Sequence, residues 1–267
     1  MLAVAPQQNS SLSFQGLTKT VGKQFFTRSD TLPRLADVFE KSKGVIGSAP
    51  NSWVEKFPKS NRGDQVKDTY KQFAQIIDDY KSHDARFKND NEMLAQRLVE
   101  LLKTKEIGEN VSLNHVDGAS YGRVFRLDVD EKSYALKIFH FKTEKENFIN
   151  YEDSHGNFWE QANAQHLKKK LGDENMFAEF FFGDVKSGYM LTRFIKDDSP
   201  KVRKNYFKDF EEIYRRFKIQ DSLKWDIPKT KLQATDIKLS NVKNGWVIDY
   251  GGIKNQEQIK RHKISIE

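Results

Sequence analysis

The order of apolar and polar residues divides the chain into three parts. Residues 1–62 are rich in Ser, Gln, Asn and Gly, with turn-forming stretches between short apolar patches, so we expect a mostly flexible segment. Residues 63–107 carry helical periodicity, and residues 108–267 change to patterns typical of strands and further helices. The sequence therefore predicts a helical extension followed by a mixed domain, with the boundary near Gly108.

Two amphipathic helices are predicted within residues 63–107. In each, apolar residues repeat every three or four positions and would face a core. The first carries Val66, Tyr70, Phe73, Ile77 and Tyr80, and the second carries Leu94, Leu98, Leu101 and Leu102 after a cap at Asn91. A shorter helix, with Pro33 in its opening turn, is predicted after Asp30.

Strand patterns follow. The stretch GRVFRLDVDEKSYALKIF (122–139) has β-branched and aromatic residues around a polar turn and predicts a hairpin, and FFFGDVKSGYMLTRFI (180–195) predicts two more strands. Asn244-Gly245 is the dipeptide that a type I′ turn favours, because both central residues need positive φ. That hairpin would bring Asn241 at its entrance close to Asp249 at its exit, with Asp236 upstream on the approaching loop.

A lysine and a glutamate are predicted to meet. Lys137 lies in the strand YALKIF, and a helix from Asn157 to Gly172 carries Glu160 at the head of a stripe completed by Ala164, Leu167 and Leu171. A carboxylate that faces a core needs a cation, so we expect a Lys137–Glu160 ion pair. The alternatives are a lysine that protects a sheet edge and a glutamate that favours the helix N-terminus.

Composition narrows the classes of function. The chain has 267 residues, a formal charge of +7 and no cysteine, which excludes disulfides and a thiolate nucleophile. The positive charge is spread along the sequence, the six histidines have no metal-ligand spacing, and no apolar stretch reaches the roughly 20 residues that span a bilayer. The first apolar run is also short for an ordinary signal peptide, so we expect a soluble protein. Because the positive charge is dispersed, we expect no nucleic-acid partner.

Three oxygen-bearing side chains, Asp236, Asn241 and Asp249, would converge at the predicted Asn244-Gly245 hairpin. Hard cations such as Mg²⁺ prefer oxygen ligands and complete their shell with water and phosphate oxygens, so the set suits a nucleotide-metal site. A pair of turns capped by Asx side chains, with no ligand, is the alternative.

Over residues 117–251 the chain resembles a protein kinase. DGASYGRV resembles the glycine-rich phosphate loop, YALK the strand lysine, Glu160 its helix partner, TDIKLSN the catalytic loop and DYG the metal-binding DFG. The resemblance implies bound ATP and Mg²⁺, with catalytic roles for Lys137, Glu160, Asp236 as the base and Lys238, and metal ligation by Asn241 and Asp249. It places nucleotide contacts, with Thr192 as gatekeeper and the hinge after it, at Ala119, Ser120, Tyr121, Gly122, Val124, Ala135, Lys137, Thr192, Arg193, Phe194 and Ile195. Because Lys137 would orient phosphate, we expect Lys137→Ala to remove turnover and leave the fold.

The chain also departs from the kinase pattern. Asp117 and Ala119 replace two loop glycines, and Ala234-Thr235 stands in place of the usual His-Arg, so regulation by loop phosphorylation is not expected. The sequence ends soon after Gly251. We therefore expect an α+β, bilobal kinase-like fold with a strongly reduced C-lobe, completed by a helix with the aromatic stripe Tyr206, Phe207, Phe210, Ile213, Tyr214 and Phe217.

A kinase reduced in this way is similar to the minimal secreted effector kinases of bacteria, of the OspG and NleH type. That resemblance implies a serine/threonine protein kinase, a transferase acting in virulence, exported by a type III system into the host cytoplasm. It implies host protein substrates and stimulation by ubiquitin or a ubiquitin-conjugating enzyme. Two alternatives stay open: a pseudokinase that binds a host partner, and a small-molecule kinase of the aminoglycoside or choline type, against which Lys238 argues because such enzymes carry histidine there.

Overall fold

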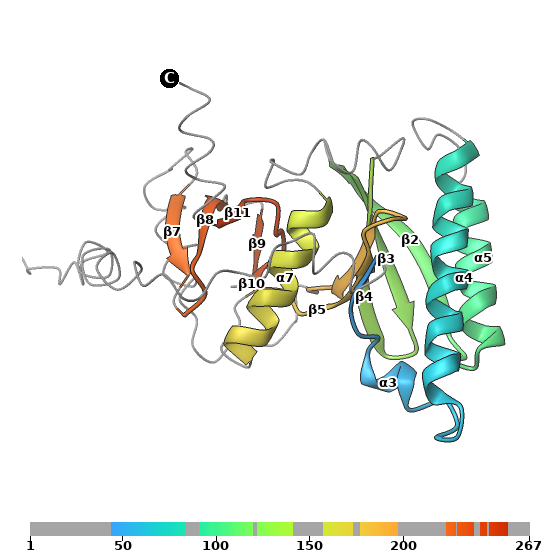
Figure 1. Cartoon of the computed structure of the whole chain (residues 1–267). Helices are drawn as coiled ribbons and strands as arrows, with labels where there is room; N and C mark the ends of the chain where they lie inside the picture. The colour runs from blue at the N-terminus through green and yellow to red at the C-terminus, as the bar shows by residue number, and fades with distance from the viewer. Residues whose placement is uncertain are drawn as a thin grey trace, which may run out of the picture. The chain divides into compact units, whose positions relative to one another are not determined.

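The computed structural model describes residues 44–83, 91–119, 122–140, 157–172, 177–196, 223–227, 229–237, 241–244 and 246–255. All of them belong to one compact unit, Ser42–Glu267. The helices predicted after Asp30 and over 206–217 lie outside the described residues. The described fold is mixed α+β, with four helices and a six-stranded antiparallel sheet, so the predicted fold class is confirmed at that level (Figure 1).

The helices are α3 (Asn51–Val54), α4 (Arg62–His83), α5 (Asn91–Thr104) and α7 (Asn157–Leu171). The large sheet has the order β1-β5-β6-β4-β3-β2, from β1 (Val45–Gly47), β2 (Val111–Ala119), β3 (Gly122–Val129), β4 (Lys132–Phe139), β5 (Phe180–Asp184) and β6 (Tyr189–Arg193). A three-stranded sheet, β11-β8-β7, contains β7 (Leu223–Ile227), β8 (Leu232–Ile237) and β11 (Ile253–Asn255). The hairpin of β9 (Val242–Lys243) and β10 (Trp246–Val247) forms the third.

The predicted hairpins form as their turn residues require. β3 and β4 pair from Val129–Lys132 onward, and Asp130 in the two-residue turn has φ 52°. β9 and β10 pair at Lys243 and Trp246, with φ 51° at Asn244, the positive φ that the turn needs at its first central position.

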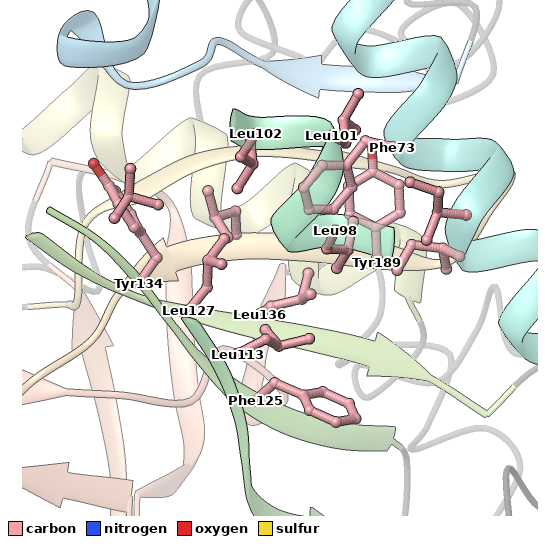
Figure 2. Close-up of a cluster of buried hydrophobic side chains, with 14 of the residues drawn as sticks. Phe73, Leu98, Leu101, Leu102, Leu113, Phe125, Leu127, Tyr134, Leu136 and Tyr189 are labelled. Carbon is pink, nitrogen blue, oxygen red and sulfur yellow. The ribbon is translucent and has the colours of Figure 1, made fainter. Parts of the chain in front are cut away.

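One face of the large sheet is covered by α4 and α5. Alternation along β4 buries Tyr134, Leu136 and Ile138 on this face. The apolar stripes predicted for the two helices pack here, as Figure 2 shows for helix and strand side chains that point toward one another. The fully buried members shared by helices and sheet include Phe73, Ile77, Leu98, Leu102, Leu127, Leu136, Phe182, Tyr189 and Leu191.

Residues 44–62 differ from the flexible segment that the sequence predicts. β1 pairs with β5 at the edge of the sheet. Trp53 in α3 is 2% exposed and packs against the rings of Tyr134 and Phe182. The segment folds because one tryptophan and neighbouring apolar residues find a core formed by distant strands. This corrects the expectation for these residues.

The structure also does not divide at Gly108. A single buried cluster contains residues from both sides of that position, from Ala49 to Leu191. Helices α4 and α5 therefore complete the core of the sheet instead of forming a separate extension. Among the described residues, no helix has both the length and the apolar character needed to cross a bilayer.

Candidate functional site

The candidate site lies on the sheet face opposite α4 and α5. Strand register places Val124, Lys137 and Met190 in one row across three strands, and Ala135 beside Thr192 in the next. Val124, Ala135 and Lys137 are partly exposed, whereas their neighbours on the other face are buried. The Lys137 ammonium lies 5.0 Å from the centre of the Phe139 ring on the same face.

Helix α7 packs on this face because β5 contains a glycine. Gly183 pairs with Met190 and so extends the row that contains Lys137. A Cβ at Gly183 would lie 2.3 Å from Gln161 Oε1 and 2.5 Å from the Tyr189 carbonyl oxygen. The missing side chain lets the first turns of α7 approach the sheet closely enough for Glu160 to reach β4.

Lys137 and Glu160 form the predicted ion pair. Lys137 Nζ lies 2.6 Å from Glu160 Oε2 and 2.9 Å from Oε1. The Glu160 side chain is 1% exposed and that of Lys137 is 16% exposed, so neither charge is solvated in the usual way. Glu160 therefore does more than favour the helix N-terminus, and Lys137 lies on an interior strand of the sheet instead of at an edge.

Asp249 is the second acid beside Lys137. Its Oδ1 lies 3.4 Å from Lys137 Nζ and accepts a hydrogen bond of 3.0 Å from the Gly251 N–H. With 35% of its side chain exposed, Asp249 is the more accessible of the two acids. Three residues separated by up to 112 positions thus meet at one ammonium group.

The charge of Lys137 is set by opposing effects. Burial acts to lower the pKa of Lys137, but the charges of Glu160 and Asp249 and their hydrogen bonds outweigh it, so the pKa lies above its ordinary value. The group is a permanent cation at neutral pH. A fixed cation beside an accessible carboxylate suits a ligand that carries both negative charge and a bound metal ion.

Asn241 lies where the hairpin prediction places it. The Ile248 N–H donates 2.8 Å to the Asn241 carbonyl, which closes the β9–β10 hairpin and brings residue 241 beside the strand leading to Asp249. The Asn244 side chain donates 2.7 Å to the Lys196 carbonyl and ties the hairpin to the segment after β6.

For Asp236, the third predicted oxygen donor, the structure describes the backbone. Asp236 lies in strand β8 and not on the loop that the sequence predicts, because residues 232–237 pair with β7 and β11. Its side chain and all of Lys238 lie outside the described set. Within that set, no three His, Asp or Glu side chains gather closely enough to hold a metal ion.

The predicted phosphate loop is a tight hairpin between β2 and β3. Ala119 pairs with Gly122, and Ser120 and Tyr121 between them lie outside the described residues. A Cβ at Gly122 would lie 2.5 Å from the Ile138 carbonyl oxygen. Close packing of β3 on β4 therefore accounts for this glycine.

The segment after β6 is the predicted hinge. Thr192 is 7% exposed and pairs with Ala135, next to the row that contains Lys137. The Arg193 N–H donates to the Glu179 carbonyl and the Phe194 N–H to the Ser133 carbonyl, at 2.7 and 3.1 Å. Those two donors already serve the fold.

Sequence reasoning missed the buried amides of α7. Asn157 Nδ2 donates 2.6 Å to the Val185 carbonyl, and Gln161 Nε2 donates to Asn157 Oδ1 and, at 3.0 Å, to the Tyr189 carbonyl. Asn163 Nδ2 donates 2.8 Å to the Ile253 carbonyl. The available signal was a pair of amides four residues apart, on either side of a glutamate that was already expected to be buried.

Tyr250 anchors the residues around Asp249. It is 1% exposed, its hydroxyl donates to the Ala178 carbonyl, and its ring stacks on Phe177 at 5.4 Å. Phe177 in turn bridges to Val247, whose carbonyl accepts the Ala178 N–H. The turn that holds Asp249 is thus fixed to the segment that leads into β5.

Comparison with known proteins adds no relative: no protein-family model matches the chain, and no curated protein sequence matches it significantly.

Proposed function

We propose that this protein is an ATP-dependent serine/threonine protein kinase. The observation that carries the proposal is the contact of Lys137 with buried Glu160 at 2.6 Å and with accessible Asp249 at 3.4 Å. In protein kinases a strand lysine paired with a helix glutamate, next to the aspartate of a DFG motif, orients the phosphates of Mg-ATP. Isolated surface ion pairs contribute little, but a buried pair with a second acid at its exposed side is costly to build unless it serves a ligand.

The order of elements supports a kinase-like fold. A tight hairpin comes first, then the lysine strand β4, the glutamate helix α7, two strands ending at the predicted hinge, and last the hairpin that precedes Asp249. Kinases arrange their phosphate loop, lysine, glutamate, catalytic loop and DFG motif in that order. The β2–β3 hairpin would correspond to the phosphate loop. The β9–β10 hairpin would correspond to the segment between the catalytic loop and the DFG motif.

The described residues fit Mg-ATP in part. Lys137 would hold phosphate oxygens, and Asp249 with Asn241 would hold Mg²⁺, since a carboxylate and an amide oxygen are suitable ligands for a hard cation. Val124, Ala135 and Thr192 offer a small, mostly apolar surface beside Lys137 for the adenine. Because Arg193 and Phe194 donate within the fold, we assign the adenine-binding donor to the Ile195 N–H.

The proposed reaction is a phosphoryl transfer. The oxygen of a substrate serine or threonine forms a bond to the γ-phosphorus as the bond to the β,γ-bridging oxygen breaks, and Asp236 accepts the hydroxyl proton. Lys238 would steady the γ-phosphate. The protein supplies position and positive charge, which are the main contributions of kinases to this reaction.

A bacterial effector setting is part of the proposal. It would give the kinase host proteins as substrates, and ubiquitin or a ubiquitin-loaded conjugating enzyme as an activator. The support is the resemblance of residues 117–251 to the minimal secreted effector kinases of bacteria.

A pseudokinase that binds a host partner is the second candidate. The observation that favours it is the internal use of two hinge N–H groups, because adenine recognition then depends on fewer backbone donors. Magnesium-dependent nucleotide binding separates the two candidates.

The test is an incubation of the purified chain with labelled ATP and a host-cell lysate, with and without ubiquitin. We expect labelled protein bands with the wild-type chain and none with Asp249→Asn, which keeps the shape of residue 249 but removes its charge. In parallel, the melting temperature should rise when Mg-ATP is added, because a ligand at 100 times its Kd stabilises the native state by about 2.7 kcal/mol. Nucleotide binding that does not depend on Mg²⁺ or on Asp249, with no labelling, would contradict the kinase proposal.

A further inference from the structure

We propose that Asn163 is a positioning residue that couples helix α7 to the segment carrying Asp249, so that both acids stay in register with Lys137. The inference rests on the proposed function for its consequence, namely the placement of Mg²⁺ relative to Lys137. The coupling itself can be measured without any nucleotide.

The contact is buried on both sides. Asn163 is 3% exposed and Ile253 is 1% exposed, and Asn163 Nδ2 donates 2.8 Å to the Ile253 carbonyl. Ile253 lies in β11, which is the outer strand of the β11-β8-β7 sheet. Asn163 thus supplies a donor to a strand edge beside which the described residues place no further strand, and such a buried carbonyl is costly to leave without a donor.

The chain between Ile253 and Asp249 transmits the position of this contact. The Ile253 N–H donates 3.2 Å to the Tyr250 carbonyl, and the Gly251 N–H donates 3.0 Å to Asp249 Oδ1. Tyr250 is held by the Ala178 carbonyl. A turn closed by two hydrogen bonds and anchored by a buried ring has few ways to absorb a shift of Ile253 without moving Asp249.

The helix side of the contact is equally constrained. Asn163 lies three residues after Glu160, so the two side chains occupy neighbouring turns of one face. Asn157 and Gln161 bind carbonyls of the β5–β6 region and fix the start of the helix to the large sheet. α7 therefore reaches Lys137 through Glu160 and reaches the Asp249 segment through Asn163, which sets the spacing of the two acids.

The first experiment is amide hydrogen exchange on the nucleotide-free full chain. Asn163→Leu, which has a similar volume and no donor, should raise exchange several-fold at residues 250–253. The matched control is His166→Leu, because His166 lies on the same helix and binds the Thr230 carbonyl at 2.9 Å. The control should raise exchange around the β7–β8 turn and leave residues 250–253 unchanged.

The second experiment measures binding of a non-hydrolysable ATP analogue with and without Mg²⁺. Coupling of this kind is worth up to roughly 30-fold in affinity. We expect Asn163→Leu to reduce the gain in affinity that Mg²⁺ provides by about tenfold, while metal-free affinity stays within about twofold of wild type. A purely structural role would lower the melting temperature and leave the Mg²⁺ gain intact well below that temperature.

The outcomes separate the coupling from the proposed function. If the wild-type chain binds no nucleotide, the proposed function fails, and hydrogen exchange still decides the coupling. Unchanged exchange at residues 250–253, or an Mg²⁺ gain equal to wild type, would overturn the role of Asn163. If Asn163→Leu does not fold, Asn163→Ser replaces it in both experiments.

Discussion

Gln161 Oε1 lies where a Cβ on Gly183 would be only 2.3 Å away, so α7 and β5 can approach each other only while residue 183 has no side chain. The same approach sets the distance from Glu160 to Lys137. A glycine in the middle of a strand is normally a weakness, and here it is the condition for the site.

Gly183→Ala should therefore push α7 away from the sheet. Because the added carbon also meets the backbone carbonyl of Tyr189 at 2.5 Å, the strain cannot be relieved by one flexible side chain. We expect a loss of about 1–3 kcal/mol in the free energy of unfolding, as overpacking costs elsewhere, and weaker nucleotide binding. Urea unfolding and nucleotide titration measure both effects.

The control for that variant is Gly63→Ala. Gly63 lies in the first turn of α4 and a Cβ there would meet nothing within 4 Å. Alanine should stabilise the helix by up to about 1 kcal/mol. Equal effects at the two positions would show that the close approach at Gly183 is not tight.

Lys137→Met should destabilise the protein strongly. It removes the ammonium 2.6 Å from Glu160 Oε2, whose side chain is 1% exposed, and breaking a buried pair on one side costs about 3–5 kcal/mol. This differs from the expectation from sequence that Lys137→Ala leaves the fold, which did not include how deeply Glu160 is buried. Urea unfolding near neutral pH measures the loss, because the raised pKa of Lys137 keeps its ammonium charged there.

The double variant Lys137→Met/Glu160→Met separates charge from packing. Replacing both charges with side chains of similar length should recover most of the lost stability, since a buried pair is often matched by apolar residues. On the proposed function, neither variant should bind nucleotide, because both lack the Lys137 ammonium. A double variant as unstable as the single one would place the defect in packing and not in the buried carboxylate that the single variant retains.

Because of Lys81, the free energy of unfolding should rise with pH. Burial lowers the pKa of Lys81 to about 8, against the opposing effects of Asp78 and Asp184. Its ammonium donates 2.7 Å to the Ser187 carbonyl. The native pKa lies below the unfolded value of 10.5, so burial of the charged ammonium destabilises the protein. This destabilisation is full below pH 8 and disappears as the pH rises to 10.5.

The free energy of unfolding of the wild type, minus that of Lys81→Met, should therefore increase between pH 7.5 and 10, by about 2 kcal/mol. Lys67→Met is the matched control on the same helix, since the Lys67 side chain is 81% exposed. If the difference in free energy of unfolding from wild type does not change with pH for either variant, the lowered pKa of Lys81 is contradicted.

Tyr250→Phe should cost stability without disturbing the ring packing. The variant removes the donor from the buried Ala178 carbonyl, which is worth about 1–3 kcal/mol, and keeps the stack on Phe177. It also changes Asp249-Tyr250-Gly251 to the DFG sequence of the proposed kinase class. Comparison with Tyr250→Leu by urea unfolding separates the hydroxyl from the ring, and a Phe variant as stable as wild type would show that the hydroxyl contact is dispensable.

A fragment of residues 108–267 should not fold cooperatively. Removal of α4 and α5 would expose the sheet face that carries Leu127, Leu136 and Leu191, all 0% exposed in the protein. A fragment of residues 42–267, which retains the compact unit, should unfold in a single cooperative transition. Tryptophan fluorescence during urea unfolding and binding of a hydrophobic dye compare the two, and a cooperative transition in the shorter fragment would contradict the integral role of the helices.

Local pattern determined much of this protein. Helical repeats specified α4, α5 and α7 with the correct buried faces, and the Asn244-Gly245 dipeptide specified the β9–β10 turn, because these features depend on residues a few positions apart. The pairing of Lys137 with Glu160 was also predictable, since a carboxylate on an apolar stripe must find a cation.

Tertiary structure decided the rest, because it depends on surfaces that meet only after folding. Residues 44–62 have too little apolar surface to indicate order by themselves, yet Trp53 is buried by strands more than 80 positions away. Asn163 and Gly183 carry no signal of their own in the sequence. The hydrogen bond to Ile253 and the close approach of α7 give these two residues their roles, and both follow from where the helix packs against strands that are distant in the chain.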